Sequence, residues 1–135
     1  MFGPISEGMR LFRSRSTIAV VGYSDRDERV SNKVTRFLIE EGNHVVGVNP
    51  NAVDSEMIEV KPQLADLENP VDMIQVFRRS TALPDLASEI LALPWRPKMV
   101  WCQQGVFDMV FQEKLERVRI QVVMDACPYA LRSYL

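Results

Sequence analysis

The sequence has few of the residues on which several common functions depend. Of its 135 residues, two are cysteines and one, His44, is a histidine. Cys102 and Cys127 form neither a disulfide framework nor a C-x-x-C pair, so we expect free thiols in a reducing cytoplasm. The single histidine excludes a His-rich metal site and any mechanism that uses two histidines. No apolar run approaches the roughly 20 residues that a membrane helix needs.

The charge balance narrows the possible partners. The net charge is −2, with 16 basic and 18 acidic side chains, so there is no global basic field to attract a nucleic acid. The first 16 residues lack the basic start and apolar core of a secretory signal. We expect one domain over residues 1–135, with an amphipathic lead-in at 1–15. A partner protein or a homo-oligomer stays open.

Apolar runs alternate with helical patterns along the chain. The run Thr17–Gly22 is rich in β-branched residues, as in a strand buried on both faces of a parallel sheet. Four more runs follow at 44–50, 71–77, 98–105 and 120–127, with helical spacing between most of them. Right-handed crossovers then predict an α/β, Rossmann-like, doubly wound parallel sheet of about five strands, with helices on both faces. Residues 51–68 are expected to be irregular.

The first strand ends in a turn that is suited to an anion. Ligands of such sheets bind beyond the carboxyl ends of the strands, where Gly22 permits a close turn and Ser24 offers a hydroxyl. The helix that follows, capped by Ser31 or Asp27, would direct its N–H groups at the same place. Basic residues add charge there, namely Arg26, Arg29 and Lys33, and we assign Arg26 and Lys33 to the ligand. Alternatively, these are solvated residues balanced by Asp25, Asp27 and Glu28.

The end of the second strand differs from that of an NAD-binding fold. Such folds place a carboxylate there for the adenosine ribose, and glycines in the first turn. Here the strand ends in Asn49 and Pro50, and the second and third glycines are missing. Asn49 could bond a ribose or phosphate, and Pro50 could lie against a base. An ordinary strand-ending turn is the alternative.

Two further strand ends carry side chains suited to a long anionic ligand. Arg78 and Arg79 follow the third strand and could bind phosphate bidentately. Phe77 could pack against a ligand, although its type is commoner in the core. After the fourth strand, Gln103 offers an amide and Gly105 permits close approach of the backbone.

Five segments in order, AVVGYS, VVGVNP, VDMIQVFRRS, VWCQQG and VVMDAC, resemble those of small stand-alone CoA-binding proteins. These are similar to the N-terminal CoA-binding domain of the succinyl-CoA synthetase α subunit. The resemblance spans about residues 16–130 and implies coenzyme A or acyl-CoA as the ligand. It implies these contacts: phosphates at Gly22, Tyr23 and Ser24, the nucleotide at Asn49 and Pro50, and further contacts at Phe77, Arg78, Arg79, Gln103 and Gly105.

The sequence also departs from the family. Its D-R-C element reads Asp125-Ala126-Cys127, which loses a basic group, and the segment DSEMIEVKPQL lacks the usual glycine. We expect no counterpart of the synthetase's phosphohistidine domain in this sequence. Cys127 stands near Asp125, which does not favour the thiolate that a nucleophile needs. We therefore assign no catalytic or metal-binding residue.

The resulting hypothesis is non-catalytic binding of coenzyme A or an acyl-CoA by a carrier, sensor or regulatory module. An NAD(H)- or nucleotide-responsive domain is the first alternative, because related folds share their pockets. The second is a ligand-free interaction module that uses an apolar patch at Phe107, Val110 and Phe111. The same three residues could instead cover the sheet.

Overall fold

The computed structural model describes residues 3–134. Six strands form one sheet: β1 (Thr17–Val21), β2 (His44–Val48), β3 (Glu59–Lys61), β4 (Met73–Val76), β5 (Met99–Cys102) and β6 (Gln121–Val123). The helices are α1 (Gly3–Phe12), α2 (Val30–Glu40), α3 (Leu83–Leu91), α4 (Met109–Glu116) and α5 (Pro128–Leu131), with 3-10 turns η1 (Leu64–Asp66) and η2 (Ser80–Ala82). None of the helices in these residues is long and apolar enough to cross a membrane.

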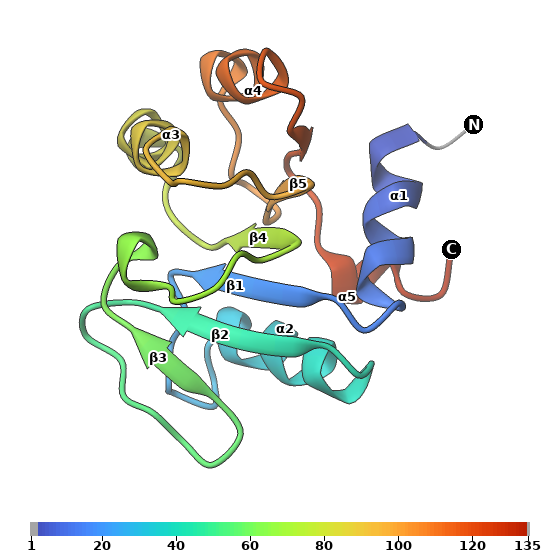
Figure 1. Cartoon of the computed structure of the whole chain (residues 1–135). Helices are drawn as coiled ribbons and strands as arrows, with labels where there is room; N and C mark the ends of the chain where they lie inside the picture. Colours follow the sequence, from blue (N-terminus) through green and yellow to red (C-terminus); the bar gives the residue numbers. More distant parts are fainter. Residues whose placement is uncertain (1–2, 135) are drawn as a thin grey trace.

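The sheet is parallel throughout, in the order β3-β2-β1-β4-β5-β6 (Figure 1). The chain builds outward from β1 through β2 to β3, and then returns to β4 on the other side of β1. Val21 lies opposite both Val48 and Val76, so the central strands end nearly level. The order reverses between β1 and β4, which is the position where open α/β sheets bind ligands.

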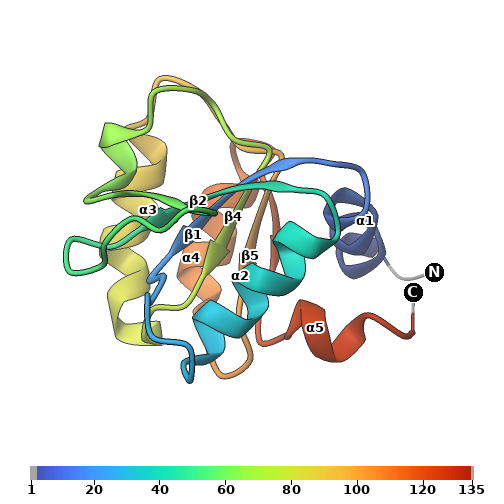
Figure 2. The same cartoon turned by 90° about the horizontal axis from the view of Figure 1, so that it is seen from below.

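Two apolar clusters fill the two faces of this Rossmann-like sheet. One joins the sheet to α3 and α4, and the other joins it to α1, α2 and α5. Figure 2 shows the strands between these two sets of helices. Burial of each apolar helix face supplies most of the driving force for this layered packing.

Within the lead-in predicted at residues 1–15, helix α1 is an integral part of the core. Met9 and Phe12 of α1 are 1% and 0% exposed, and the Phe12 ring packs against Trp101 at 5.1 Å between ring centroids. The indole N–H of Trp101 donates to the Ala126 carbonyl at 2.8 Å. The start of the chain is thereby joined to β5 and to the segment after β6.

Three local predictions differ from the structure. The segment expected to be irregular contains the sixth strand, β3, which pairs along β2 from Glu59 to Lys61. Arg29, and not Ser31 or Asp27, occupies the N-cap of α2. Phe111 is 1% exposed and covers the sheet, so it is not part of the apolar surface patch to which it was assigned.

Candidate ligand-binding site

The first loop is held between the ends of β2 and β4. The Gly22 N–H donates to the Val48 carbonyl at 2.9 Å, and the Phe77 N–H donates to the Val21 carbonyl at 2.8 Å. Gly22 has a φ of +85°, and a Cβ there would lie 2.7 Å from the Phe77 carbonyl oxygen. Only glycine permits this backbone conformation without strain and this close approach.

Hydrogen bonds fasten the loop to the start of α2. The Ser24 N–H donates to the Ser31 hydroxyl, and the Asn32 amide donates to the Ser24 carbonyl, both at 3.0 Å. The Ser24 hydroxyl accepts the Arg26 N–H at 3.2 Å, so its own proton remains available to a ligand. Ser31 thus supports the loop in place of capping the helix.

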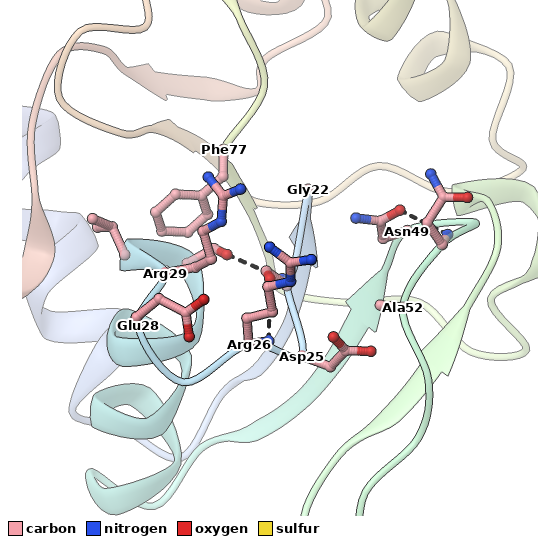
Figure 3. A pocket seen from close by; sticks show the side chains of 12 residues that line it. Gly22, Asp25, Arg26, Glu28, Arg29, Asn49, Ala52 and Phe77 are labelled. Carbon is pink, nitrogen blue, oxygen red and sulfur yellow. Dashed lines mark hydrogen bonds between the residues drawn. The ribbon is translucent and has the colours of Figure 1, made fainter.

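A hollow of about 690 Å³ opens in front of this loop. It is lined by Gly22, Ser24, Asp25, Arg26, Glu28, Arg29, Val30, Ser31, Asn49, Asn51, Ala52 and Phe77. Figure 3 shows the Arg26 guanidinium between Phe77 on one side and Asn49 on the other, with the Arg29 guanidinium next to Phe77 in this view. The N-cap residue Arg29 and the first two residues of α2, Val30 and Ser31, line this hollow, and the Arg29 side chain makes no capping hydrogen bond within the described residues.

Asn49 braces the wall of the hollow. Its amide nitrogen donates to the Tyr23 carbonyl at 2.8 Å, and its amide oxygen accepts the Asn51 N–H at 2.9 Å. The side chain therefore joins the loops after β1 and β2 and keeps one amide proton for a ligand. Pro50 is exposed and does not line the hollow.

A second hollow of about 510 Å³ continues along the ends of β4 and β5. Its lining comprises Val30, Phe77, Arg78, Arg79, Gln103, Gln104, Gly105 and Val106. Val30 and Phe77 belong to both hollows, so the two adjoin and form one crevice. Phe77 is half-buried: it packs against the core and also lines both hollows.

Gln103 and Gly105 occupy the far end of the crevice. Gln103 is 7% exposed, and its amide oxygen accepts from the Gln75 amide at 3.2 Å, which leaves its own N–H groups for a ligand. Gly105 has a φ of +85°, and its N–H donates to the Asp125 carboxylate at 2.6 Å. Asp125 therefore fixes the turn after β5.

Besides Pro50, two more residues predicted at the site have side chains that lie elsewhere. The Tyr23 side chain is 4% exposed and packs across β2, where a Cβ on Gly47 would lie 2.7 Å from the tyrosine ring. Lys33 is one helical turn beyond the crevice and lines a separate hollow with Cys127 and Tyr129. The helical period explains why Lys33 does not line the crevice. Arg29 at the N-cap and Lys33 lie on the same face of α2, one turn apart, and only Arg29 reaches the loop.

The two thiols have different surroundings. Burial raises the pKa of Cys102 to about 12, so this thiol is protonated and unreactive at neutral pH. Cys127 is half-buried and borders the hollow that contains Lys33. Neither thiol lines the crevice.

Some crevice residues were missed by the sequence-based site. Asn51 and Ala52 line it because the turn after Asn49 bends back toward the first loop. The Asn-Pro-Asn spacing of an Asx turn is the signal that could have indicated this. Arg29 was counted among the basic residues of the loop but was not assigned a contact with the ligand.

Comparison with known proteins identifies the family. Residues 16–132 match the family described as CoA binding domain. The chain belongs to this CoA-binding domain family. A curated relative, the Uncharacterized protein YneT of Bacillus subtilis (strain 168), is 31% identical over 122 residues, which cover 90% of this chain and 89% of that protein.

Solved structures share the architecture of this chain. A Thermus thermophilus protein is 37% identical, with a TM-score of 0.84 over 95% of this chain and 96% of that one. A hypothetical protein from Pyrococcus horikoshii OT3 is 22% identical, with a TM-score of 0.84 over 96% and 90% of the two chains. The second likeness shows the fold alone. The CoA-binding domain here therefore shares both sequence and architecture with proteins of similar length.

Proposed function

We propose that this domain binds coenzyme A or an acyl-CoA, without catalysing a reaction, along the crevice at the strand ends. The observation that carries this proposal is the pair of adjoining hollows, which together hold four arginines against two carboxylates and carry the amides of Gln103 and Gln104 at the far end. Coenzyme A suits both features, because it is anionic at the nucleotide and rich in amides along its arm. A carrier, sensor or regulatory role is compatible with such binding.

The strand order suggests how the ligand would lie. The ends of β2, β1, β4 and β5 follow one another across the sheet. The nucleotide would lie against Asn49, the pyrophosphate at Gly22, Ser24 and the start of α2, and the arm along Phe77 toward Gln103. Arg26 and Arg29 would neutralise the pyrophosphate from one side, and Arg78 and Arg79, next to Phe77, from the other.

The charge of the crevice favours an anion. Four arginines and two carboxylates line it: Arg26, Arg29, Arg78 and Arg79 against Asp25 and Glu28. Within residues 3–134, none of the ion pairs shorter than 4.0 Å engages these four arginines, so their charge is available to a ligand. Tyr23, Lys33 and Pro50 are left out of the proposed contacts because their side chains do not line the crevice.

Calorimetric titration with CoA, acetyl-CoA, dephospho-CoA and NAD tests the proposal. We expect saturable binding of CoA and acetyl-CoA, weaker binding of dephospho-CoA, and none of NAD. CoA at 100 times its dissociation constant should stabilise the fold by about 2.7 kcal/mol. Binding of NAD alone would support the nucleotide-responsive alternative. No heat with any of the four ligands would reject the proposal and favour an interaction module, for which Phe107 and Val110 are 56% and 58% exposed.

A further inference from the structure

A further hollow leaves the crevice at Val30 and runs between α2 and α5. Its volume is about 490 Å³, and we call it the α2–α5 groove. Figure 2 shows the two helices side by side on one face of the sheet. The rings of Phe37 and Tyr129 join them in an edge-to-face contact, with 5.4 Å between the ring centroids. The contacts proposed for coenzyme A do not use this groove.

The groove adjoins the end of the crevice where the arm of the ligand would finish. Val30 lines both hollows of the crevice as well as the groove. The Ala126 N–H donates to the Cys102 carbonyl at 3.3 Å, so Cys127, which lines the groove, follows beside the end of β5. Gln103, at the far end of the crevice, is the next residue after this strand. A chain attached to the end of the arm would therefore meet the entrance of the groove.

Apolar side chains form the walls of the groove. They come from Val30, Val34 and Phe37 of α2, and from Cys127 and Tyr129 at the start of α5. Val34 is buried, whereas Val30 and Tyr129 are 55% and 47% exposed. The groove thus has a closed apolar floor and apolar walls that are still in contact with water. Covering these walls with a hydrocarbon chain is favourable.

The charged residues of the groove are compatible with such a chain. Lys33 and Arg36 are exposed, and long cationic side chains of this kind lay their aliphatic stems along apolar surface with the charge in water. Glu40 follows Phe37 by three residues on α2 and also lines the groove. Its carboxylate is unfavourable for an apolar chain that extends so far.

The length of α2 sets the length of chain that fits. Val30 and Phe37 are seven residues apart, which is about 10 Å along the helix axis and matches an extended chain of about eight carbons. A shorter chain would leave the Phe37 end of the groove in water. A much longer chain would pass Phe37 and reach Glu40.

We propose that the α2–α5 groove holds the acyl chain of an acyl-CoA and favours a linear, saturated chain of about eight carbons. This inference rests on the proposed binding of coenzyme A in the crevice, because the thioester joins the chain to the arm. The nucleotide and the arm contact the crevice, and the acyl chain lies against Val34, Phe37 and Tyr129. The groove therefore selects among acyl-CoAs that the crevice alone would bind alike.

Calorimetric titration with linear acyl-CoAs from acetyl to dodecanoyl tests this proposal. Burial of each CH₂ group should tighten binding about twofold or more, so octanoyl-CoA should bind about thirtyfold or more tightly than acetyl-CoA. The gain should end near ten carbons. Equal affinities of acetyl-CoA and octanoyl-CoA, or a gain that continues unbroken to dodecanoyl-CoA, would overturn the inference and leave the proposed function standing. Failure of every acyl-CoA to bind would reject both.

Alkylation of Cys127 by iodoacetamide, followed by mass spectrometry, locates the chain in the unaltered protein. Neither acetyl-CoA nor octanoyl-CoA has a free thiol, so neither competes for the reagent. At saturation of both ligands, octanoyl-CoA should slow the alkylation of Cys127 about fivefold more than acetyl-CoA, because the chain covers the half-buried thiol. Equal protection by the two ligands would place the chain outside the groove and overturn the proposal.

Tyr129→Ala separates the groove from the crevice. The substitution removes one wall of the groove at a half-exposed position, and the melting temperature shows whether the variant folds. It should reduce the preference for octanoyl-CoA over acetyl-CoA about fivefold and leave the affinity for acetyl-CoA unchanged. The matched control is Tyr134→Ala, at an exposed tyrosine outside the groove, which should keep the preference. An unchanged preference in folded Tyr129→Ala would overturn the proposal, and the alkylation result decides it if this variant does not fold.

Discussion

Gly22 and the main chain of Phe77 lie so close that no side chain fits between them. A Cβ on residue 22 would approach the Phe77 carbonyl oxygen to 2.7 Å, at a φ of +85°. This contact joins the ends of β1 and β4 and forms the floor where the two hollows meet.

Gly22→Ala should therefore destabilise the fold and impair the crevice together. We expect a loss of about 1–3 kcal/mol in the free energy of unfolding, from the strained φ and the displaced Phe77. Urea unfolding measures the first effect, and CoA titration of the folded fraction measures the second. Gly3→Ala is the control, because its Cβ would have no neighbour within 4 Å although its φ is also positive, at +55°. Equal stability of the two variants would contradict this account.

Arg78→Ala combined with Arg79→Ala should weaken CoA binding without unfolding the protein. Both side chains are exposed at the mouth of the crevice, where they supply charge but little packing. A charge-assisted hydrogen bond contributes about 1.5–3 kcal/mol, so a tenfold or greater loss of affinity is expected. The control is Lys114→Ala with Arg117→Ala, which removes two positive charges on and just after α4. Unchanged affinity in the first variant would leave these arginines without a role in binding.

Asn49→Ala should lower both stability and affinity. It removes the bonds to the Tyr23 carbonyl and from the Asn51 N–H, at 2.8 and 2.9 Å. Two such bonds contribute about 1–3 kcal/mol together. Thermal unfolding and calorimetry measure the two effects. Asn51→Ala, whose side chain makes neither bond, should retain the stability, and an equal loss there would argue against bracing by Asn49.

The two cysteines should differ in their reaction with thiol reagents. Cys102 has a pKa raised by burial to about 12, so raising the pH from 7 to 9 should leave it protonated and unlabelled in the folded protein. Cys127 is half-buried and should be modified first. Mass spectrometry should therefore show one label before unfolding and two after it. Cys127→Ser should abolish the early label, whereas an early label on that variant would contradict the inertness of Cys102.

The five long apolar runs were sufficient to predict the parallel sheet, because each strand is buried on both faces and has a distinctive composition. β3 was missed because Glu59–Lys61 is short, charged and at the sheet edge, where pairing with β2 is the only signal. Topology alone indicated Gly22, Asn49, Phe77 and Gln103 at the crevice. It could not indicate which way a side chain turns, and this explains the positions of Tyr23 and Lys33.

The sequence also could not show which residues of α4 and of the loop before it are buried. The sequence analysis treated Phe107, Val110 and Phe111 as one group, either a surface patch or cover for the sheet, but the helix begins only at Met109 and buries Phe111 and Leu115. Phe107 belongs to the preceding loop, where its N–H donates to the Ser80 hydroxyl at 3.0 Å. Periodicity identified the helix, whereas its starting residue depended on the Asp108 cap.

The pairing of β1 with β4 also joins two consecutive parts of the chain. Strands β1 to β3 are complete before residue 62, and strands β4 to β6 begin after residue 72. A molecule that spans from Asn49 to Gln103 contacts both parts. It would hold the earlier and later parts of the polypeptide together and would slow their separation. Hydrogen exchange should then decline in β2 and β5 alike when coenzyme A is added.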